Sequence, residues 1–138
     1  MKALVVEDEF SSRKILQKFL KSLGEVDVAT DGHEAIEAIE TSIKDGAPYQ
    51  LICLDIMIPD ISGLEVITKI REIEAANGIH GLDGTKIIMT SARNDKETIL
   101  SCFKKGCEAY LIKPISKSKL DDQLKNLGFS PSKDSAES

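Results

Sequence analysis

Four short apolar runs in this 138-residue chain each lead into residues with reactive or ligand-binding side chains. These residues supply three carboxylates, a hydroxyl and an amine: Glu7, Asp8, Asp55, Thr90 and Lys113. Uninterrupted apolar runs of this length are typical of strands that are buried on both faces of a parallel sheet. Because ligands bind at the edge where the carboxyl ends of parallel strands meet, we expect these side chains to form one site.

The composition of this predicted site favours phosphoryl chemistry. Two carboxylates about 4 Å apart repel each other by roughly 4 kcal/mol at an effective dielectric constant near 20. Three of them should therefore have raised pKa values or hold a cation. Oxygen ligands without His or Cys favour magnesium, with manganese as the alternative. An amine and a hydroxyl beside that cation can bind a phosphoryl group, and a carboxylate can be the nucleophile that accepts it.

Five strands alternating with five helices are expected to position these residues. Apolar runs and turn signals predict strands over 3–6, 25–29, 51–54, 86–89 and 109–112. Helical periodicity predicts helices over about 11–23, 33–44, 64–76, 95–106 and 116–127. This alternation implies right-handed crossovers, with helices on both faces of a parallel sheet.

The strand-end residues together resemble the receiver domain of two-component response regulators. The matching motifs are Glu7-Asp8, Asp55, Thr90 and Lys113-Pro114, which occur in the family's order. The resemblance covers about residues 1–128, which we expect to form one receiver domain. It implies a doubly wound α/β fold of the flavodoxin/CheY-like kind, a five-stranded parallel sheet with strand order 2-1-3-4-5 and five helices. Residues 129–138 are mostly polar, and we expect a disordered tail there.

The resemblance also assigns roles around a magnesium ion. Asp55 corresponds to the phosphorylated aspartate, and it is also one of the expected metal ligands. Asp8 matches a direct metal ligand. Glu7 stands at the first acidic position of the family, where contact with the metal directly or through water remains open. Met57, two residues after the acceptor, would ligate the metal with its backbone carbonyl.

Further positions match the groups that bind the phosphoryl group and respond to it. Thr90 corresponds to the hydroxyl that bonds the phosphoryl group and shifts after phosphorylation. Lys113 matches the lysine that pairs with the phosphoryl oxygens, and the family usually has a cis peptide at the position of Lys113-Pro114. Tyr110 stands at the aromatic switch position, whose side chain turns inward as Thr90 moves.

Each of these residues alone has an ordinary explanation, and other classes of protein share parts of the pattern. A strand-end Asp or Thr can simply cap a helix. A phosphatase of the haloacid-dehalogenase type needs a second Asp where this chain has Met57, so we do not expect an enzyme that acts on external substrates. A flavin-mononucleotide binder would not place Glu7-Asp8-Glu9 at its phosphate loop. A phosphorylation-independent interaction module and an intermediate in a phosphorelay remain open.

The resemblance implies a stand-alone signalling protein. A sensor histidine kinase or a phosphotransfer protein would phosphorylate it. An unidentified downstream protein would then bind the surface formed by helix four, strand five and helix five, here about residues 95–127. The chain would act as a monomer or as a phosphorylation-dependent dimer.

Charge and composition exclude several other classes. The formal net charge of -5 argues against a nucleic-acid binder. No apolar stretch is long enough to span a membrane, and Met1-Lys2 directly before the first strand leaves no room for a signal peptide. The three cysteines lack paired spacing, which argues against a disulfide framework or a zinc site. We therefore expect a cytoplasmic protein.

Overall fold

A five-stranded parallel sheet forms the centre of the computed structural model, which describes residues 1–130. The strands are β1 (Lys2–Val6), β2 (Glu25–Ala29), β3 (Leu51–Asp55), β4 (Lys86–Ser91) and β5 (Ala109–Ile112). They lie in the order β2-β1-β3-β4-β5. The predicted fold class and strand order are confirmed. The predicted tail lies, from residue 131 onward, outside the described residues.

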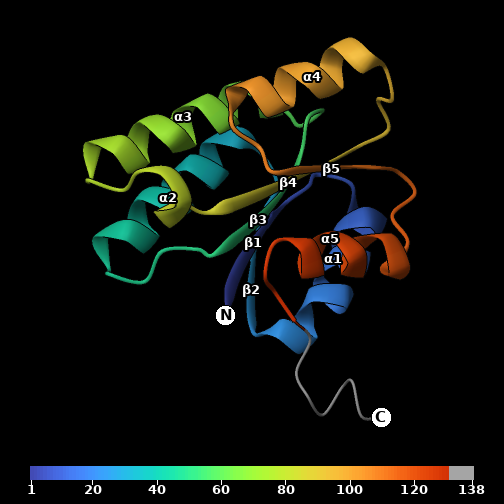
Figure 1. Cartoon of the computed structure of the whole chain (residues 1–138), viewed down its shortest axis with the longest axis horizontal. Coiled ribbons are helices and arrows are strands. Elements are labelled where there is room, and N and C mark those ends of the chain that lie inside the picture. The colour runs from blue at the N-terminus through green and yellow to red at the C-terminus, as the bar shows by residue number, and fades with distance from the viewer. Residues whose placement is uncertain (131–138) are drawn as a thin grey trace.

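Helices cover both faces of the sheet (Figure 1). They are α1 (Phe10–Leu20), α2 (Gly32–Lys44), α3 (Gly63–Ala76), α4 (Lys96–Lys105) and α5 (Lys117–Asn126). Helices α1 and α5 pack on one face, and α2, α3 and α4 pack on the other. None of the helices in residues 1–130 has the length and apolarity needed to cross a membrane.

Burial on both faces explains why the strands are continuous apolar runs. Successive side chains of a strand point to opposite faces. In β1, Leu4 and Val6 pack beneath α2 and α3, whereas Ala3 and Val5 pack beneath α1 and α5. Every residue of the central strand β3 is buried. The three cysteines are also buried as free thiols, at Cys53 in β3, Cys102 in α4 and Cys107 before β5.

Side chains that accept backbone N–H groups fix where the helices begin. Asp95 accepts the N–H of Thr98 at the start of α4, and Ser116 accepts the N–H of Lys119 at the start of α5. The first helix begins at Phe10, one residue earlier than predicted, because Glu9 caps it. It ends at Leu20, and a short 3-10 turn, η1 (Lys21–Leu23), completes the predicted segment.

Candidate functional site

The carboxyl edge of the sheet brings Asp55 and Lys113 into contact. Asp55 is the last residue of β3 and is only 4% exposed. Its Oδ2 lies 2.7 Å from the Lys113 Nζ, and its Oδ1 accepts the N–H of Met57 at 3.0 Å. Lys113 follows β5, and its own N–H donates to the Ser91 carbonyl at 2.8 Å. The sheet therefore places a charged donor directly on the predicted phosphoacceptor.

Glu7 is the second carboxylate that contacts Lys113. It is fully buried, and its Oε1 lies 2.6 Å from the Lys113 Nζ. Its Oε2 accepts the N–H of Glu9 at 3.1 Å. Burial raises the pKa of Glu7, and the hydrogen bond from Lys113 acts in the opposite direction. The pKa of Lys113 is raised: burial opposes the charged form, but hydrogen bonds to Asp55 and Glu7 outweigh it.

Asp8 completes an acidic cluster with Glu7 and Asp55. One carboxylate oxygen from each of these residues lies within 4.8 Å of the others. Lys113 supplies one positive charge to three carboxylates, so the cluster attracts further cationic charge. Because the donors are all hard oxygens and Asp8 is exposed to solvent, the set fits a hydrated divalent cation such as Mg²⁺. The Met57 side chain is 62% exposed, and ligation by its carbonyl stays a prediction.

Thr90 lies beside Asp55 on the neighbouring strand β4, where the two residues are paired in register. The Thr90 side chain is fully buried, and its Oγ1 has no hydrogen-bond partner among residues 1–130. Buried hydroxyls are normally hydrogen-bonded, so an unpaired one beside a carboxylate is available to a ligand.

Tyr110 is bound to the loop that follows β4. Its ring is half-buried, and its hydroxyl donates to the Arg93 carbonyl at 2.6 Å. The N–H of Arg93 donates to the Ser91 Oγ at 3.1 Å, which fixes the same loop from its other side. Tyr110 and Thr90 thus border one connection between the site and α4. At the end of β5, the peptide bond between Lys113 and Pro114 is cis.

Asp60 lies in the loop that follows Asp55. It has a positive φ of 72°, and its Oδ1 and Oδ2 accept the N–H groups of Gly32 and His33 at 2.9 and 3.0 Å. Burial opposes ionisation of Asp60, but these N–H groups and that of Ile61 lower its pKa to about 2. The loop after β3 is therefore fastened to the start of α2.

The connection from β3 to α3 also depends on close backbone packing at Gly63. A Cβ added there would lie 2.5 Å from the Asp55 carbonyl oxygen and 2.7 Å from the Ile56 Cα. The Gly63 N–H donates to the Ile56 carbonyl at 2.8 Å. The contacts of this loop to α2 could not be predicted from the sequence, because no local pattern relates Asp60 to Gly32.

Comparison with known proteins identifies the family. A model of the response regulator receiver domain matches residues 3–125. The chain belongs to this family. Receiver domains are phosphoacceptor modules of two-component signalling and are not a family of enzymes for external substrates. The family predicted from the strand-end residues is confirmed.

The relatives and solved structures support this assignment. Hybrid signal transduction histidine kinase L of Dictyostelium discoideum is 38% identical over 128 residues, which are 92% of this chain and 7% of that protein. Transcriptional regulatory protein ResD of Bacillus subtilis is 36% identical over 83% of this chain and 42% of its own length. The chain thus spans less than half the length of either relative.

A solved receiver domain that contains Mg²⁺ shows the same architecture. The receiver domain of the histidine kinase CKI1 from Arabidopsis thaliana, complexed with Mg²⁺ and BeF3⁻, has a TM-score of 0.76 and 27% identity. The alignment covers 91% of this chain and 88% of that one. CheY in a CheX–CheY–BeF3–Mg²⁺ complex from Borrelia burgdorferi shares the fold, with a TM-score of 0.79 over 92% of this chain and 88% of that one, at 22% identity.

Proposed function

We propose that residues 1–128 act as a receiver that accepts a phosphoryl group on Asp55 from a sensor histidine kinase or a phosphotransfer protein. The observation that carries this proposal is the position of Asp55, which contacts the Lys113 ammonium at 2.7 Å and is paired in register with Thr90, whose buried hydroxyl has no partner among residues 1–130. A carboxylate oxygen of Asp55 forms a bond to phosphorus while the phosphorus–nitrogen bond of the donor histidine breaks. The electron pair of that bond returns to the histidine ring.

The acidic cluster supports a magnesium requirement for this transfer. Asp8 and Asp55 would hold the ion with the Met57 carbonyl, and Glu7 would contact it directly or through water. When bound, Mg²⁺ supplies positive charge between the acceptor carboxylate and the phosphoryl oxygens. Manganese suits the same oxygen donors.

Lys113 and Thr90 would then bind the phosphoryl oxygens. Lys113 already donates to Asp55, so a small movement transfers its charge to the new group. Movement of the Thr90 hydroxyl toward the phosphoryl group would open space beside β4 for Tyr110. The Tyr110 hydroxyl would then lose its hydrogen bond to the Arg93 carbonyl, and the ring would turn inward. This change would shift the population of conformations of the loop before α4.

The surface of α4, β5 and α5 is suited to report this change to a protein partner. Exposed apolar side chains occur there at Leu100, Phe103 and Ile112, which are 49%, 44% and 44% exposed. An apolar group surrounded by charged residues is typical of a protein interaction site. The downstream protein would bind a monomer or a phosphorylation-dependent dimer.

A second candidate function is an intermediate step in a phosphorelay. Several relatives are named hybrid signal transduction histidine kinases, in which the matched segment is a small part of the protein. In that case Asp55 passes its phosphoryl group onward to a histidine of another protein. The acceptor chemistry at Asp55 is the same in both functions.

The central test compares wild type with Asp55→Asn in the presence of Mg²⁺ and acetyl phosphate. We expect intact-protein mass spectrometry to show one added phosphoryl group in wild type and none in the variant, because an amide is not a nucleophile of this kind. Asp45→Asn is the matched control, because Asp45 is exposed at the end of α2. Equal modification of wild type and Asp55→Asn would overturn the proposal.

A further inference from the structure

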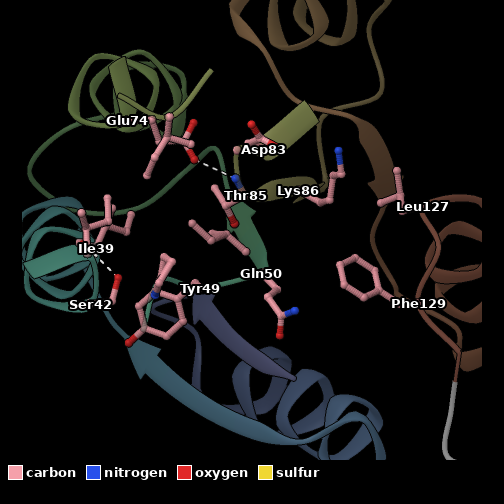
Figure 2. A pocket seen from close by; sticks show the side chains of 15 residues that line it. Ile39, Ser42, Tyr49, Gln50, Glu74, Asp83, Thr85, Lys86, Leu127 and Phe129 are labelled. Carbon is pink, nitrogen blue, oxygen red and sulfur yellow. Dashed lines mark hydrogen bonds between the residues drawn. The ribbon is translucent and has the colours of Figure 1, made fainter. Parts of the chain in front are cut away.

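A cavity of about 290 Å³ lies at the edge of the sheet opposite to Asp55. Its walls come from α2, the segment that enters β3, the end of α3, the loop before β4 and the residues after α5. Figure 2 shows how these side chains surround it. Thr85 lies directly before β4, whereas Thr90 lies near the other end of that strand, so this cavity is separate from the acidic cluster.

Most of the wall is apolar. Ile39 and Ile79 contribute aliphatic surface, and Tyr49 and Phe129 contribute aromatic rings. An apolar cavity of about 150 Å³ is sufficient to bind benzene. The cavity in this chain is almost twice that size, so it is large enough for a ligand of two fused rings.

One wall carries a hydroxyl with unused hydrogen-bonding capacity. Thr85 is 8% exposed, and its Oγ1 has no hydrogen-bond partner within residues 1–130. Figure 2 shows its side chain between Glu74 and Gln50. The Thr85 N–H is already used, since it donates to the Glu74 Oε2 at 2.7 Å. Because an unpaired buried hydroxyl is unfavourable, a ligand donor that reached it would gain affinity.

The wall carries three charged groups, Glu74, Asp83 and Lys86, and Glu74 is paired with Arg71 from outside the wall. The Glu74 carboxylate is buried, and its Oε1 accepts from the Arg71 Nη1 at 2.7 Å. Asp83 and Lys86 contribute one charge of each sign. A charged ligand would therefore gain little from the wall and would lose its hydration on entry.

We propose that this cavity binds an uncharged ligand the size of two fused rings, whose single N–H or O–H donor is accepted by the Thr85 hydroxyl. The apolar rings occupy the space between Tyr49, Ile79 and Phe129. The site is separate from phosphorylation at Asp55, so either function can be present without the other.

Two probes of equal shape test the proposal on the full chain. Indole carries an N–H donor, and indene has the same ring framework without one. We expect saturable binding of one indole molecule, with amide NMR shifts centred on Tyr49 and Thr85 and a dissociation constant below about 1 mM. Indene should bind more weakly at the same residues.

Three variants separate the hydroxyl from the cavity. Thr85→Val removes the hydroxyl while keeping the shape of the side chain. It should lower the affinity for indole about fivefold and leave the affinity for indene unchanged. Thr68→Val is the matched control on α3, outside the cavity, and should affect neither probe. Ile79→Trp fills the cavity and should abolish binding of both. Thermal unfolding without probe shows whether each variant is folded.

The outcomes that overturn the proposal are distinct. Absence of saturable binding of both probes to wild type would exclude a ligand of this class. Equal loss of indole and indene affinity in Thr85→Val would exclude acceptance by the hydroxyl. Unchanged binding in Ile79→Trp would place the probes elsewhere. Since none of these measurements involves phosphorylation, their failure leaves the proposed function of Asp55 unaffected.

Discussion

Lys113 contacts two carboxylates of the acidic cluster at once. Its Nζ lies 2.6 Å from the Glu7 Oε1 and 2.7 Å from the Asp55 Oδ2. Glu7 is fully buried, so its charge depends on this partner. Transfer of Lys113 toward a phosphoryl group would therefore weaken its bond to Glu7 as well as to Asp55.

Replacing Lys113 by Met should destabilise the folded chain by about 3 kcal/mol at pH 7.5, because two buried carboxylates lose their partner. The pKa of Glu7, already raised by burial, should rise further without the hydrogen bond from Lys113. Glu7 then binds a proton in the folded state at a pH where the unfolded state does not. The stability deficit should accordingly shrink as the pH is lowered from 7.5 to 5. Urea unfolding at several pH values measures this.

Lys117→Met provides the control for that prediction. Lys117 also pairs with a carboxylate, at 2.9 Å from Asp121, but both side chains are exposed. Its replacement should change stability by less than about 0.5 kcal/mol, with no comparable pH dependence. Equal losses of stability in Lys113→Met and Lys117→Met would show that the burial of Glu7 does not determine how much stability is lost.

At the scale of elements, each α-helix begins after a residue whose side chain accepts an N–H group, and at α1, α2 and α4 this side chain is a carboxylate. Asp95 accepts from the hydroxyl and the N–H of Thr98, and from the side chain of Arg93. These bonds lower the pKa of Asp95 to about 2, and the Thr98 hydroxyl has the largest effect, followed by the Thr98 N–H and Arg93. The start of α4, next to the loop that Tyr110 holds, is therefore stabilised by an ionised carboxylate.

This predicts a specific pH window for Asp95→Asn. The carboxylate stabilises the folded state above its ordinary pKa of 3.8, and that stabilisation is lost as the pH falls through about 2. The urea midpoint of wild type should exceed that of Asp95→Asn at pH 6, and the difference should disappear between pH 4 and 2. Ser116→Ala, which removes an uncharged cap from α5, should lower the midpoint by a nearly constant amount. A constant difference for both variants would contradict the prediction.

The elements and the site differ in how far the sequence determines them. Runs such as 51–54 predicted their strands because burial on both faces leaves only apolar residues. Asp55, Thr90 and Lys113 could be brought together because parallel strands end at one edge. The contact of Lys113 with Glu7, the fastening of Asp60 to α2 and the cavity beside Thr85 depend on packing between distant segments. No local pattern encodes that packing.

At the scale of the whole molecule, the acidic cluster makes stability depend on divalent cations. Binding of Mg²⁺ to the folded state alone should add about 1.4 kcal/mol when its concentration is ten times its dissociation constant. Asp8→Asn should be more stable than wild type without Mg²⁺, because one repelling carboxylate of the cluster is removed. Asp8→Asn should gain less stability than wild type when Mg²⁺ is added. Thermal unfolding with and without Mg²⁺ at matched ionic strength measures both effects.

Asp45→Asn makes the same change in net charge outside the cluster. It should keep the full gain from Mg²⁺. A gain from Mg²⁺ that is the same in all three proteins would place the ion outside the cluster of Glu7, Asp8 and Asp55.

The three buried thiols can report local unfolding of the chain, because each becomes reactive only when the structure around it opens. Burial raises the pKa of Cys53 and Cys107 to about 12 and also raises that of Cys102, so no thiolate is available while the fold is closed. Cys102 lies in α4 and Cys107 just after it, whereas Cys53 lies in the central strand. The alkylation rate of Cys102 and Cys107 therefore reports local unfolding of α4. The alkylation rate of Cys53 reports opening of the sheet. The rate at which each thiol reacts gives the lifetime of the structure around it.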